Sequence, residues 1–253
     1  MIKPIKIDSH YKPSEKLLQG RSILITGAGD GIGKELAISA AMHGAEPILL
    51  GRTQAKLEQV YDLIEGQTGI QPIICPLDLE ELNEDRADEL ANSLSSEMNG
   101  KLDGLVHNAG LLGQRTPIQN YSAKTWNSVM QVNINACFIL SKALIPLMSA
   151  SPDASMIFTS SGVGRTGKAF WGAYSVSKFA VEGLAQLLSE ELSETTSIRV
   201  NTVNPGITRT SMRAAAAPAE NPESIKPPAD IMYGYLYLLG PDSKDMTGQS
   251  IDL

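Results

Sequence analysis

Residues 22–33, S-I-L-I-T-G-A-G-D-G-I-G, place a short apolar run directly before a glycine-rich loop. The first five residues are typical of a buried strand, and a helical pattern begins at the end of the stretch. Glycines at positions 27, 31 and 33 let the backbone turn tightly and approach a phosphate without an intervening Cβ. In a doubly wound fold, a strand followed by such a loop and a helix N-terminus binds a pyrophosphate. The stretch therefore predicts a phosphate-binding turn after the first strand.

Outward from this stretch, short apolar runs alternate with helical patterns as far as the C-terminus. We expect strands at 22–26, 47–51, 73–77, 102–107, 155–161, 197–204 and 249–253. We expect helices at 32–43, 53–65, 80–98, 123–149, 174–194 and 229–239. Nearly continuous apolar strands separated by helices indicate a parallel sheet covered on both faces. The sequence predicts an α/β fold: a single doubly wound domain with a seven-stranded, mainly parallel sheet and helices on both faces.

The composition limits the partners and the compartment. Of the 253 residues, 42% are hydrophobic and 19% are charged, which suits one globular domain. A formal charge of -7 argues against nucleic acid, whose phosphates require a basic face. The N-terminus lacks the apolar run of a signal peptide, and we see no stretch of the roughly 18 apolar residues that a membrane span needs. We therefore expect a cytoplasmic protein with neither nucleic acid nor a membrane as partner.

Two further expectations concern organisation and metals. Residues 1–20 are polar and contain two prolines, so we expect an N-terminal arm that lies on or off a single domain at 21–253. Cys75 and Cys137 lack the spacing of metal ligands, and the three histidines are far apart. The sequence therefore predicts no metal site.

A second informative stretch, residues 161–178, contains Ser161, Tyr174 and Lys178. Residues four apart share one face of a helix, so Lys178 is expected beside Tyr174. A phenol with a pKa near 10 is a poor acid–base catalyst at neutral pH, and a neighbouring ammonium lowers that pKa. Ser161 would then donate a hydrogen bond to the substrate oxygen. Taken alone, the Tyr–Lys pair could equally be an ordinary helix-surface pair.

The end of the second strand indicates which nicotinamide cofactor is bound. An NAD site usually presents a carboxylate there to the ribose 2′-hydroxyl, whereas a 2′-phosphate requires a cation. This sequence has Leu50-Gly51-Arg52-Thr53 and no nearby acid. Arg52 can hold a phosphate bidentately, so we predict NADP(H) as the cofactor. The alternative is that Arg52 is a solvated loop residue.

Together these motifs resemble the short-chain dehydrogenase/reductase family, in its branch of about 250 residues. The resemblance covers residues 21–252 and rests on T-G-A-G-D-G-I-G at 26–33, Asp78, N-A-G at 108–110, Q-V-N at 131–133, the Ser161/Tyr174/Lys178 set and N-P-G-I-T-R-T at 204–210. The finer pattern, including H-N-A-G-L-L-G at 107–113, resembles the YciK-type bacterial oxidoreductases within that family. The family resemblance implies a Rossmann-type fold.

The resemblance also implies roles for individual residues. Tyr174 would be the general acid in carbonyl reduction and the base in alcohol oxidation, and Ser161 would bind the substrate oxygen. Lys178 would bind the nicotinamide ribose and lower the pKa of Tyr174, while Asn133 would anchor a water that links Lys178 to solvent. The implied cofactor-binding set is Gly27, Asp30, Gly31, Ile32, Gly33, Arg52, Asp78, Leu79, Asn108, Ala109, Gly110, Tyr174, Lys178, Pro205, Gly206, Thr208 and Thr210.

The expected function is an NADP(H)-dependent oxidoreductase that moves a hydride between the nicotinamide and the carbonyl or alcohol carbon of a small molecule. Residues 207–228, rich in alanine and proline, correspond to the family's substrate lid. Phe170 and Trp171 could line the pocket, belong to the core or face a partner subunit. Two alternatives stay open: an NADP-binding regulatory protein with little turnover, and a non-redox reaction on the same fold. By analogy with relatives, we expect a homodimer or homotetramer formed through the helices at 123–149 and 174–194.

Overall fold

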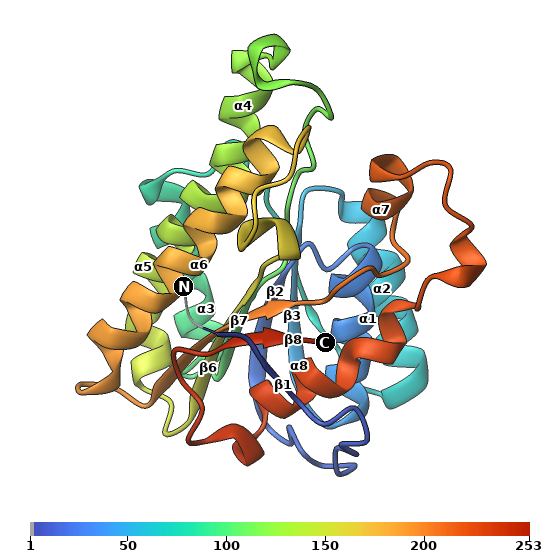
Figure 1. The fold of residues 1–253 in the computed structure, drawn as a ribbon. Coiled ribbons are helices and arrows are strands. Elements are labelled where there is room, and N and C mark those ends of the chain that lie inside the picture. Colours follow the sequence, from blue (N-terminus) through green and yellow to red (C-terminus); the bar gives the residue numbers. More distant parts are fainter. Residues whose placement is uncertain (1–2) are drawn as a thin grey trace.

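The apolar runs of the sequence form neighbouring strands of one sheet in the computed structural model, which describes residues 3–253 (Figure 1). The strands are β1 (Ile5–Lys6), β2 (Ser22–Thr26), β3 (Glu46–Gly51), β4 (Ile73–Pro76), β5 (Gly104–His107), β6 (Ala154–Thr159), β7 (Ile198–Asn204) and β8 (Ser250–Asp252). The helices are α1 (Gly31–Met42), α2 (Gln54–Thr68), α3 (Glu84–Glu97), α4 (Ala123–Met130), α5 (Ala136–Ser149), α6 (Gly172–Ser193), α7 (Ser211–Ala216) and α8 (Met232–Leu239). Short helical turns are η1 (Ile118–Asn120), η2 (Gln131–Asn135), η3 (Gly162–Gly164), η4 (Pro222–Ser224), η5 (Pro228–Ile231) and η6 (Pro241–Ser243).

The strand order creates a crevice at the carboxyl ends of the central strands. The order is β1-β8-β7-β6-β5-β2-β3-β4, and every pairing in it is parallel. From β2 the chain first moves outward through β3 and β4, then returns to add β5 on the other side of β2. Loops that leave β2 and β5 therefore diverge to opposite faces, and ligands of such folds bind at this point. The predicted doubly wound fold is confirmed.

The sheet has one strand more than the seven predicted. Ile5 and Lys6 form β1, which pairs in parallel with Ile251 and Asp252 of β8. Both β1 residues are exposed, so no buried apolar run marks this strand in the sequence. The predicted arm therefore lies against the domain where the structure describes it, although its residues 1–2 lie outside the described range. The division at residue 20 stays a prediction.

Alternate residues of each central strand supply two separate cores. Ile23 and Ile25 of β2 face α1, α2 and α8, while Leu24 between them faces α3, α5 and α6. This follows from the period of two in a strand, which points successive side chains to opposite faces. Figure 1 shows the two helical layers, with α1, α2 and α8 on one side of the sheet and α3, α5 and α6 on the other. Burial on both faces explains the nearly continuous apolar strands.

Helices α4 and α5 form one continuous helical stretch from Ala123 to Ser149, joined by the single π turn η2. By length and composition alone this stretch could cross a membrane, which differs from our expectation that no stretch is apolar enough. Half of the apolar window is buried within the protein. Leu140 and Leu144 of α5, for example, pack in the core on the α3/α5/α6 side of the sheet. Packing against the sheet therefore accounts for much of this apolarity.

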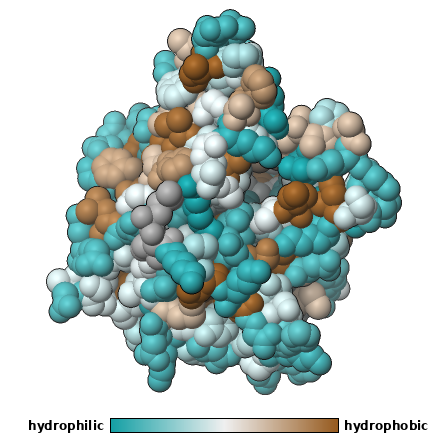
Figure 2. Space-filling view, viewed as in Figure 1, coloured by the Kyte–Doolittle hydropathy of each residue, from teal (hydrophilic) through white to brown (hydrophobic). Residues whose placement is uncertain are grey.

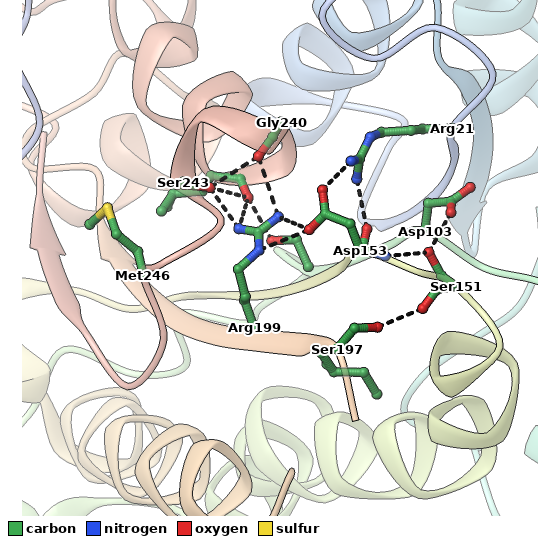
Figure 3. A network of polar contacts seen from close by, with 12 residues as sticks. Arg21, Asp103, Ser151, Asp153, Ser197, Arg199, Gly240, Ser243 and Met246 are labelled. Carbon is green, nitrogen blue, oxygen red and sulfur yellow. Dashed lines mark hydrogen bonds and ion pairs between the residues drawn. The ribbon is translucent and has the colours of Figure 1, made fainter. Parts of the chain in front are cut away.

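A polar network ties the strands together at the end of the sheet opposite the crevice (Figure 3). Asp153, just before β6, bonds to Arg21 before β2 and to Arg199 in β7, whose Nε lies 3.1 Å from Asp153 Oδ1. Arg199 also donates to the carbonyl oxygens of Leu238 (2.8 Å) and Gly240 (3.3 Å) at the end of α8. The buried guanidinium thus joins two strands and a helix end, and Figure 3 shows Asp153 between the two arginines.

Candidate active site

The crevice contains a cavity of about 420 Å³ that is lined by most of the predicted site residues. They come from the glycine loop after β2, the ends of β3 to β7, the start of α6 and the lid. The predicted residues that line it are Gly27, Asp30, Gly31, Ile32, Arg52, Asp78, Leu79, Asn108, Ala109, Gly110, Ser161, Tyr174, Lys178, Pro205, Gly206, Thr208 and Thr210. Gly33 and Asn133 do not line the cavity. The fold therefore brings together residues that lie up to 183 positions apart, from Gly27 to Thr210.

The glycine loop has two separate geometric requirements. Gly27 has a φ of +70°, a left-handed conformation that favours glycine. A Cβ at Gly33 would lie 2.4 Å from the carbonyl oxygen of Gly27 and 2.6 Å from Asn108 Nδ2. Gly33 therefore allows α1 to pack closely against the loop, instead of contacting a ligand in the cavity directly. The N-terminus of α1 is left facing the cavity, where an anion is favoured.

Asp30 organises the mouth of this loop. Its side chain caps α1 by accepting a hydrogen bond from the Gly31 N–H at 2.7 Å. Its other carboxylate oxygen lies 3.0 Å from Lys56 Nζ and 3.4 Å from the hydroxyl of Ser211 in the lid. The hydrogen bond from Lys56 is the main cause of a lowered pKa for Asp30, which therefore stays ionised. The lysine partner on α2 and the serine partner on α7 could not be predicted from the sequence.

Thr26 fixes the N-A-G segment against the first strand. Its hydroxyl oxygen accepts hydrogen bonds from the main-chain N–H groups of Asn108 (2.9 Å) and Ala109 (3.0 Å). Asn108 Nδ2 in turn donates to the Thr26 carbonyl oxygen at 3.1 Å. Thr26 is buried and is a site residue that the sequence analysis missed. The feature of the sequence that could have identified Thr26 is its position at the end of β2, level with Asn108 after β5.

The far end of the cavity is cationic. Arg52 follows Gly51 at the end of β3 and is exposed, and Lys56 in the first turn of α2 also lines the cavity. Thr53 is the N-cap residue of α2, but its side chain makes no capping hydrogen bond. Asp78, one of the predicted cofactor-binding residues, accepts a hydrogen bond from the Glu80 N–H at 3.0 Å. An exposed arginine and a free helix N-terminus suit a phosphate group at this end.

Tyr174 and Lys178 lie one turn apart near the start of α6, and both are buried. Lys178 Nζ donates a 2.6 Å hydrogen bond to the carbonyl oxygen of Thr159 at the end of β6. It lies 5.7 Å from the centroid of the Tyr174 ring. Ser161 and Tyr174 both line the cavity, and the Ser161 side chain acts on the pKa of Tyr174. This arrangement can give a proton to a substrate oxygen and hold that oxygen at the same time.

The pKa of Tyr174 is shifted upward in the protein alone, and its lowering by Lys178 together with a bound cofactor stays a prediction. Burial raises the pKa because it disfavours the phenolate, and the hydrogen bond from Ser161 opposes this only in part. The Lys178 ammonium is bonded to Thr159, and burial lowers the pKa of Lys178 as well. Tyr174 is therefore a protonated phenol at neutral pH in this structure.

Asn133 lies in the π turn η2 and supports the site from behind the cavity wall. Its Oδ1 accepts a hydrogen bond from the Leu111 N–H at 2.7 Å, and its Nδ2 donates to the Leu111 carbonyl oxygen at 3.0 Å. The same Nδ2 donates to the hydroxyl of Ser177, also at 3.0 Å. Single π turns often occur at functional sites. The amide therefore joins the segment after β5 to α6, and its predicted role in holding a water stays a prediction.

His107, directly before the N-A-G segment, is a buried neutral histidine. Its ring stacks on Phe158 at a centroid distance of 4.6 Å, and Nε2 lies 2.9 Å from the hydroxyl of Ser141. Burial, together with the positive charge of Lys178, lowers the pKa of His107 to about 3. His107 thus packs at the strand end without lining the cavity.

The segment expected as a substrate lid forms a loop that is closed at its base. Thr208 and Lys226 form an isolated parallel bridge, and the Arg209 N–H donates to the Lys226 carbonyl oxygen at 2.9 Å. Thr210 caps α7, and its side chain would lie 3.2 Å from a Cβ placed at Gly31. The lid therefore lies directly over the glycine loop. The sequence analysis gave no helix for residues 211–216.

Trp171 and Phe170 differ in their surroundings. Trp171 lines the cavity, and its ring centroid lies 5.7 Å from that of Tyr174. Phe170 is exposed and has a φ of +70°, an uncommon value for a residue other than glycine. Within residues 3–253, the buried Trp171 Nε1 and the hydroxyl of Ser160 have no hydrogen-bond partner.

Comparison with known proteins agrees with this geometry. A profile described as short chain dehydrogenase matches residues 21–221. The chain is 49% identical to the oxidoreductase YciK of Escherichia coli K12 over 243 residues, covering 96% of this chain and 95% of YciK.

Two similar solved structures carry a nicotinamide cofactor. A short chain dehydrogenase from Escherichia coli CFT073, solved in complex with NADPH, is 49% identical with a TM-score of 0.92 and covers 95% of this chain and 99% of that one. A short chain dehydrogenase from Shigella flexneri 2a strain 301, solved in complex with NADP, is 48% identical with a TM-score of 0.92 and covers 94% and 99%. The motifs, the fold and these relatives agree: the chain belongs to the short-chain dehydrogenase family and is an oxidoreductase of the YciK type.

Proposed function

We propose that this chain is an NADP(H)-dependent carbonyl reductase that uses Tyr174 as its proton donor. The observation that carries the proposal is the meeting of Tyr174, Ser161 and Lys178 in one cavity with the glycine loop of a dinucleotide site. The reverse reaction, oxidation of an alcohol, would use the same groups with Tyr174 as base.

The cavity suits NADP(H) at both of its phosphate positions. At the glycine loop, Gly27, Gly29 and Gly31 line the cavity without side chains beside the N-terminal turn of α1, which leaves room for a pyrophosphate. At the far end, Arg52 and Lys56 lie beside the uncapped N-terminus of α2, which suits a 2′-phosphate. The similar structures solved with NADP and NADPH support this cofactor. We expect Arg52→Ala to weaken NADPH binding and to leave NADH binding unchanged.

When bound, the nicotinamide supplies or accepts the hydride. The chain supplies the proton: the Tyr174 phenol donates it to the substrate oxygen, while the Ser161 hydroxyl holds that oxygen by a hydrogen bond. Lys178, fixed by the Thr159 carbonyl, keeps a positive charge near the phenolate that forms. Because burial keeps the phenol protonated at neutral pH, the site is prepared to give a proton.

The walls around Tyr174 indicate the kind of carbonyl compound that fits. The cavity lining includes the apolar residues Leu111, Leu112, Trp171, Met212 and Ala216, and the Trp171 ring centroid lies 5.7 Å from that of Tyr174. Arg213 of α7 also lines the cavity, but it forms an ion pair with Glu220 within the lid. We propose a ketone, aldehyde or quinone carried on a hydrophobic body as the substrate.

The test compares the parent protein with Tyr174→Phe. NADPH oxidation is followed against a panel of ketones, aldehydes and quinones, and NADPH binding is measured separately by fluorescence. We expect the variant to bind NADPH and to lose about 10²- to 10⁴-fold in turnover, the usual contribution of a general acid. Tyr61→Phe is the matched control, because Tyr61 lies on α2 away from the cavity.

Each outcome discriminates between the candidate functions. Turnover that survives in Tyr174→Phe would show that Tyr174 is not the proton donor. NADPH binding without turnover of any panel compound would favour a regulatory NADP-binding protein. Conversion of a substrate with no change in NADPH would favour a non-redox reaction on the same fold.

We further propose that the protein is cytoplasmic and that it assembles as a homodimer or homotetramer through the helices at 123–149 (α4, η2 and α5) and 174–194 (α6). Four large apolar side chains are exposed on these helices: Phe138, Val176, Phe179 and Leu187. Figure 2 shows hydrophobic side chains among polar ones on the α5–α6 side of this face. A monomeric mass by light scattering would contradict the assembly.

A further inference from the structure

Three separate chain segments form the end of the cavity where a substrate would meet Tyr174. The first follows β5, the second leads into α6, and the third is the lid helix α7. Their lining residues are Leu111 and Leu112, Trp171 and Tyr174, and Met212 and Ala216, respectively. Figure 1 shows α7 standing apart from the α4–α6 column, and Figure 2 shows a notch between the two. The width of this end therefore depends on how the three segments are held relative to one another.

Arg115 belongs to one of these three segments and contacts the other two. It belongs to the segment after β5, and its Nε donates to the Phe170 carbonyl oxygen at 3.2 Å. Its Nη1 donates to the carbonyl oxygen of Ala216, in α7, at 2.9 Å. The same guanidinium lies over the Trp171 ring, 4.1 Å from the ring centroid. A planar guanidinium can make two directed hydrogen bonds and an aromatic stack at once, which an ammonium cannot.

The contact at Phe170 supports an unfavourable backbone conformation. Phe170 has a φ of +70°, which side-chain-bearing residues rarely adopt and which persists only when surrounding contacts impose it. Arg115 holds the carbonyl of this residue and also covers the ring of the next one, Trp171. Because Trp171 is tilted by 45° against the Tyr174 ring, the position of this loop sets one wall beside the proton donor.

The contact at Ala216 holds the lid. Ala216 is the last residue of α7, and the terminal carbonyls of a helix lack partners within the helix. Arg115 supplies a partner there, while Ser211 at the first turn of α7 contacts Asp30 at 3.4 Å. The lid helix is thus held at one end to the glycine loop. At its other end, Arg115 joins it to the loop that carries Trp171.

We propose that Arg115 is a positioning residue that couples the lid to Trp171 and thereby sets the affinity for the carbonyl substrate. Arg115 does not line the cavity, so it acts through Trp171 and α7 and not by contact with reacting atoms. The proposal rests on the proposed reductase function for its kinetic part. Its structural part, the coupling of lid and loop, can be measured without a substrate.

The kinetic test compares Arg115→Ala with Arg209→Ala. Arg209 is a matched control, because it is a lid arginine that pairs with the exposed Glu223 and touches neither Phe170 nor Ala216. We expect Arg115→Ala to raise KM for the substrate by about tenfold, the equivalent of about 1.4 kcal/mol. The value of kcat and the affinity for NADPH should stay unchanged. Arg115→Lys keeps the charge but not the planar fork, so an intermediate KM is expected.

The structural test uses no substrate. Trypsin cleavage after Arg213, detected by mass spectrometry, should be faster in Arg115→Ala than in the parent or in Arg209→Ala. Emission of Trp171, isolated in a Trp126→Phe background, should shift in Arg115→Ala because the stacked guanidinium is removed.

The two tests together distinguish a failure of the Arg115 proposal from a failure of the proposed reductase function. An unchanged KM together with unchanged cleavage and emission would show that Arg115 does not position these segments. Equal losses of substrate and NADPH affinity would indicate general loosening and would also overturn the proposal. Faster cleavage and shifted emission, in a protein that reduces no carbonyl, would support the coupling while the reductase function fails.

Discussion

At the scale of single residues, His107 shows how burial controls protonation. It stacks on Phe158, bonds to Ser141 and has its pKa lowered to about 3 by burial and by the charge of Lys178. An unfolded histidine has a pKa near 6.5. Between these values the unfolded chain binds a proton that the folded chain does not. The contribution of His107 to folding is therefore fully present above about pH 6.5 and is lost as the pH falls towards 3.

We predict that His107→Gln makes the protein less sensitive to acid. The parent should lose up to about 1.4 kcal/mol per pH unit from this one group over that window. Urea unfolding at pH 7.5 and pH 5 measures the loss in each protein, and comparing the two losses cancels any pH-independent cost of the substitution. Equal losses in parent and variant would show that His107 is not neutral in the folded state.

The residues of the site differ in how far the sequence could identify them. The loop that contains Gly27 and Gly31 follows an apolar strand directly, so the place of these glycines in the crevice could be predicted from local pattern alone. Tyr174 and Lys178 could be placed on one helix face because they are four residues apart. Arg115 could not be found, because its partners Phe170 and Ala216 lie 55 and 101 positions away and both present main-chain carbonyls. Because every residue type has a main-chain carbonyl, the amino-acid sequence does not show which carbonyl will accept a hydrogen bond.

At the scale of elements, the start of α6 depends on a close approach of the turn η3. A Cβ at Gly164 would lie 2.7–2.9 Å from the Cβ, carbonyl carbon and oxygen of Lys178. The absence of a side chain there lets the turn after Ser161 pack directly on the helix that carries Tyr174. The position of Ser161 relative to Tyr174 therefore depends on a packing contact of glycine with helix backbone.

We predict that Gly164→Ala lowers both stability and turnover. Because the contact is with backbone, the helix start must move, at a cost of about 1–3 kcal/mol. Gly66→Ala in α2 is the matched control: a Cβ there meets no atom within 4 Å, so replacing a helical glycine should stabilise by about 0.5–1 kcal/mol. Urea unfolding and carbonyl-dependent NADPH oxidation measure the two effects. Full activity in Gly164→Ala would contradict this account of the site.

Elements with long apolar runs or a clear helical period were predictable, and those fixed by tertiary contacts were not. Strand β2 matches its predicted bounds, because five consecutive apolar or small residues are buried. The two-residue β1 is exposed and exists only by pairing with β8. The π turn around Asn133 depends on hydrogen bonds to Leu111 and Ser177, which no local pattern encodes.

At the scale of the whole molecule, stability and function are concentrated at opposite ends of the sheet. The cavity lies at the carboxyl ends of the strands, whereas Asp153 and its two arginines join the amino ends (Figure 3). Burial alone would raise the pKa of Asp153, but the charges of Arg199 and Arg21 outweigh it and hold the pKa below its usual value. The carboxylate therefore contributes stability above about pH 4, which is lost as the pH falls further through the folded pKa.

We predict that Arg199→Met destabilises the protein without affecting the cavity. The change leaves Asp153 with Arg21 as its remaining arginine partner and removes a donor from the Leu238 and Gly240 carbonyls, so we expect a loss of at least about 2 kcal/mol at pH 7. The affinity for NADPH at low temperature should stay that of the parent. Between pH 5 and pH 3 the parent should lose more stability than the variant. An equal loss of stability between pH 5 and pH 3 in both proteins would show that Arg199 does little to stabilise the ionised form of Asp153.

The pairing of β1 with β8 also has a consequence for how the chain is made. Ile5 lies opposite Ile251 and Lys6 opposite Asp252, so, within residues 3–253, the strand that is synthesised first pairs with the strand that is synthesised last. Because β8 is the neighbour of β1 among the strands that the structure describes, β1 can join the sheet only after β8 has been synthesised. The same pairing brings residues 5–6 next to residues 251–252. A short linker between them, with new ends cut at an exposed loop, should give a circular permutant that keeps every strand of the sheet.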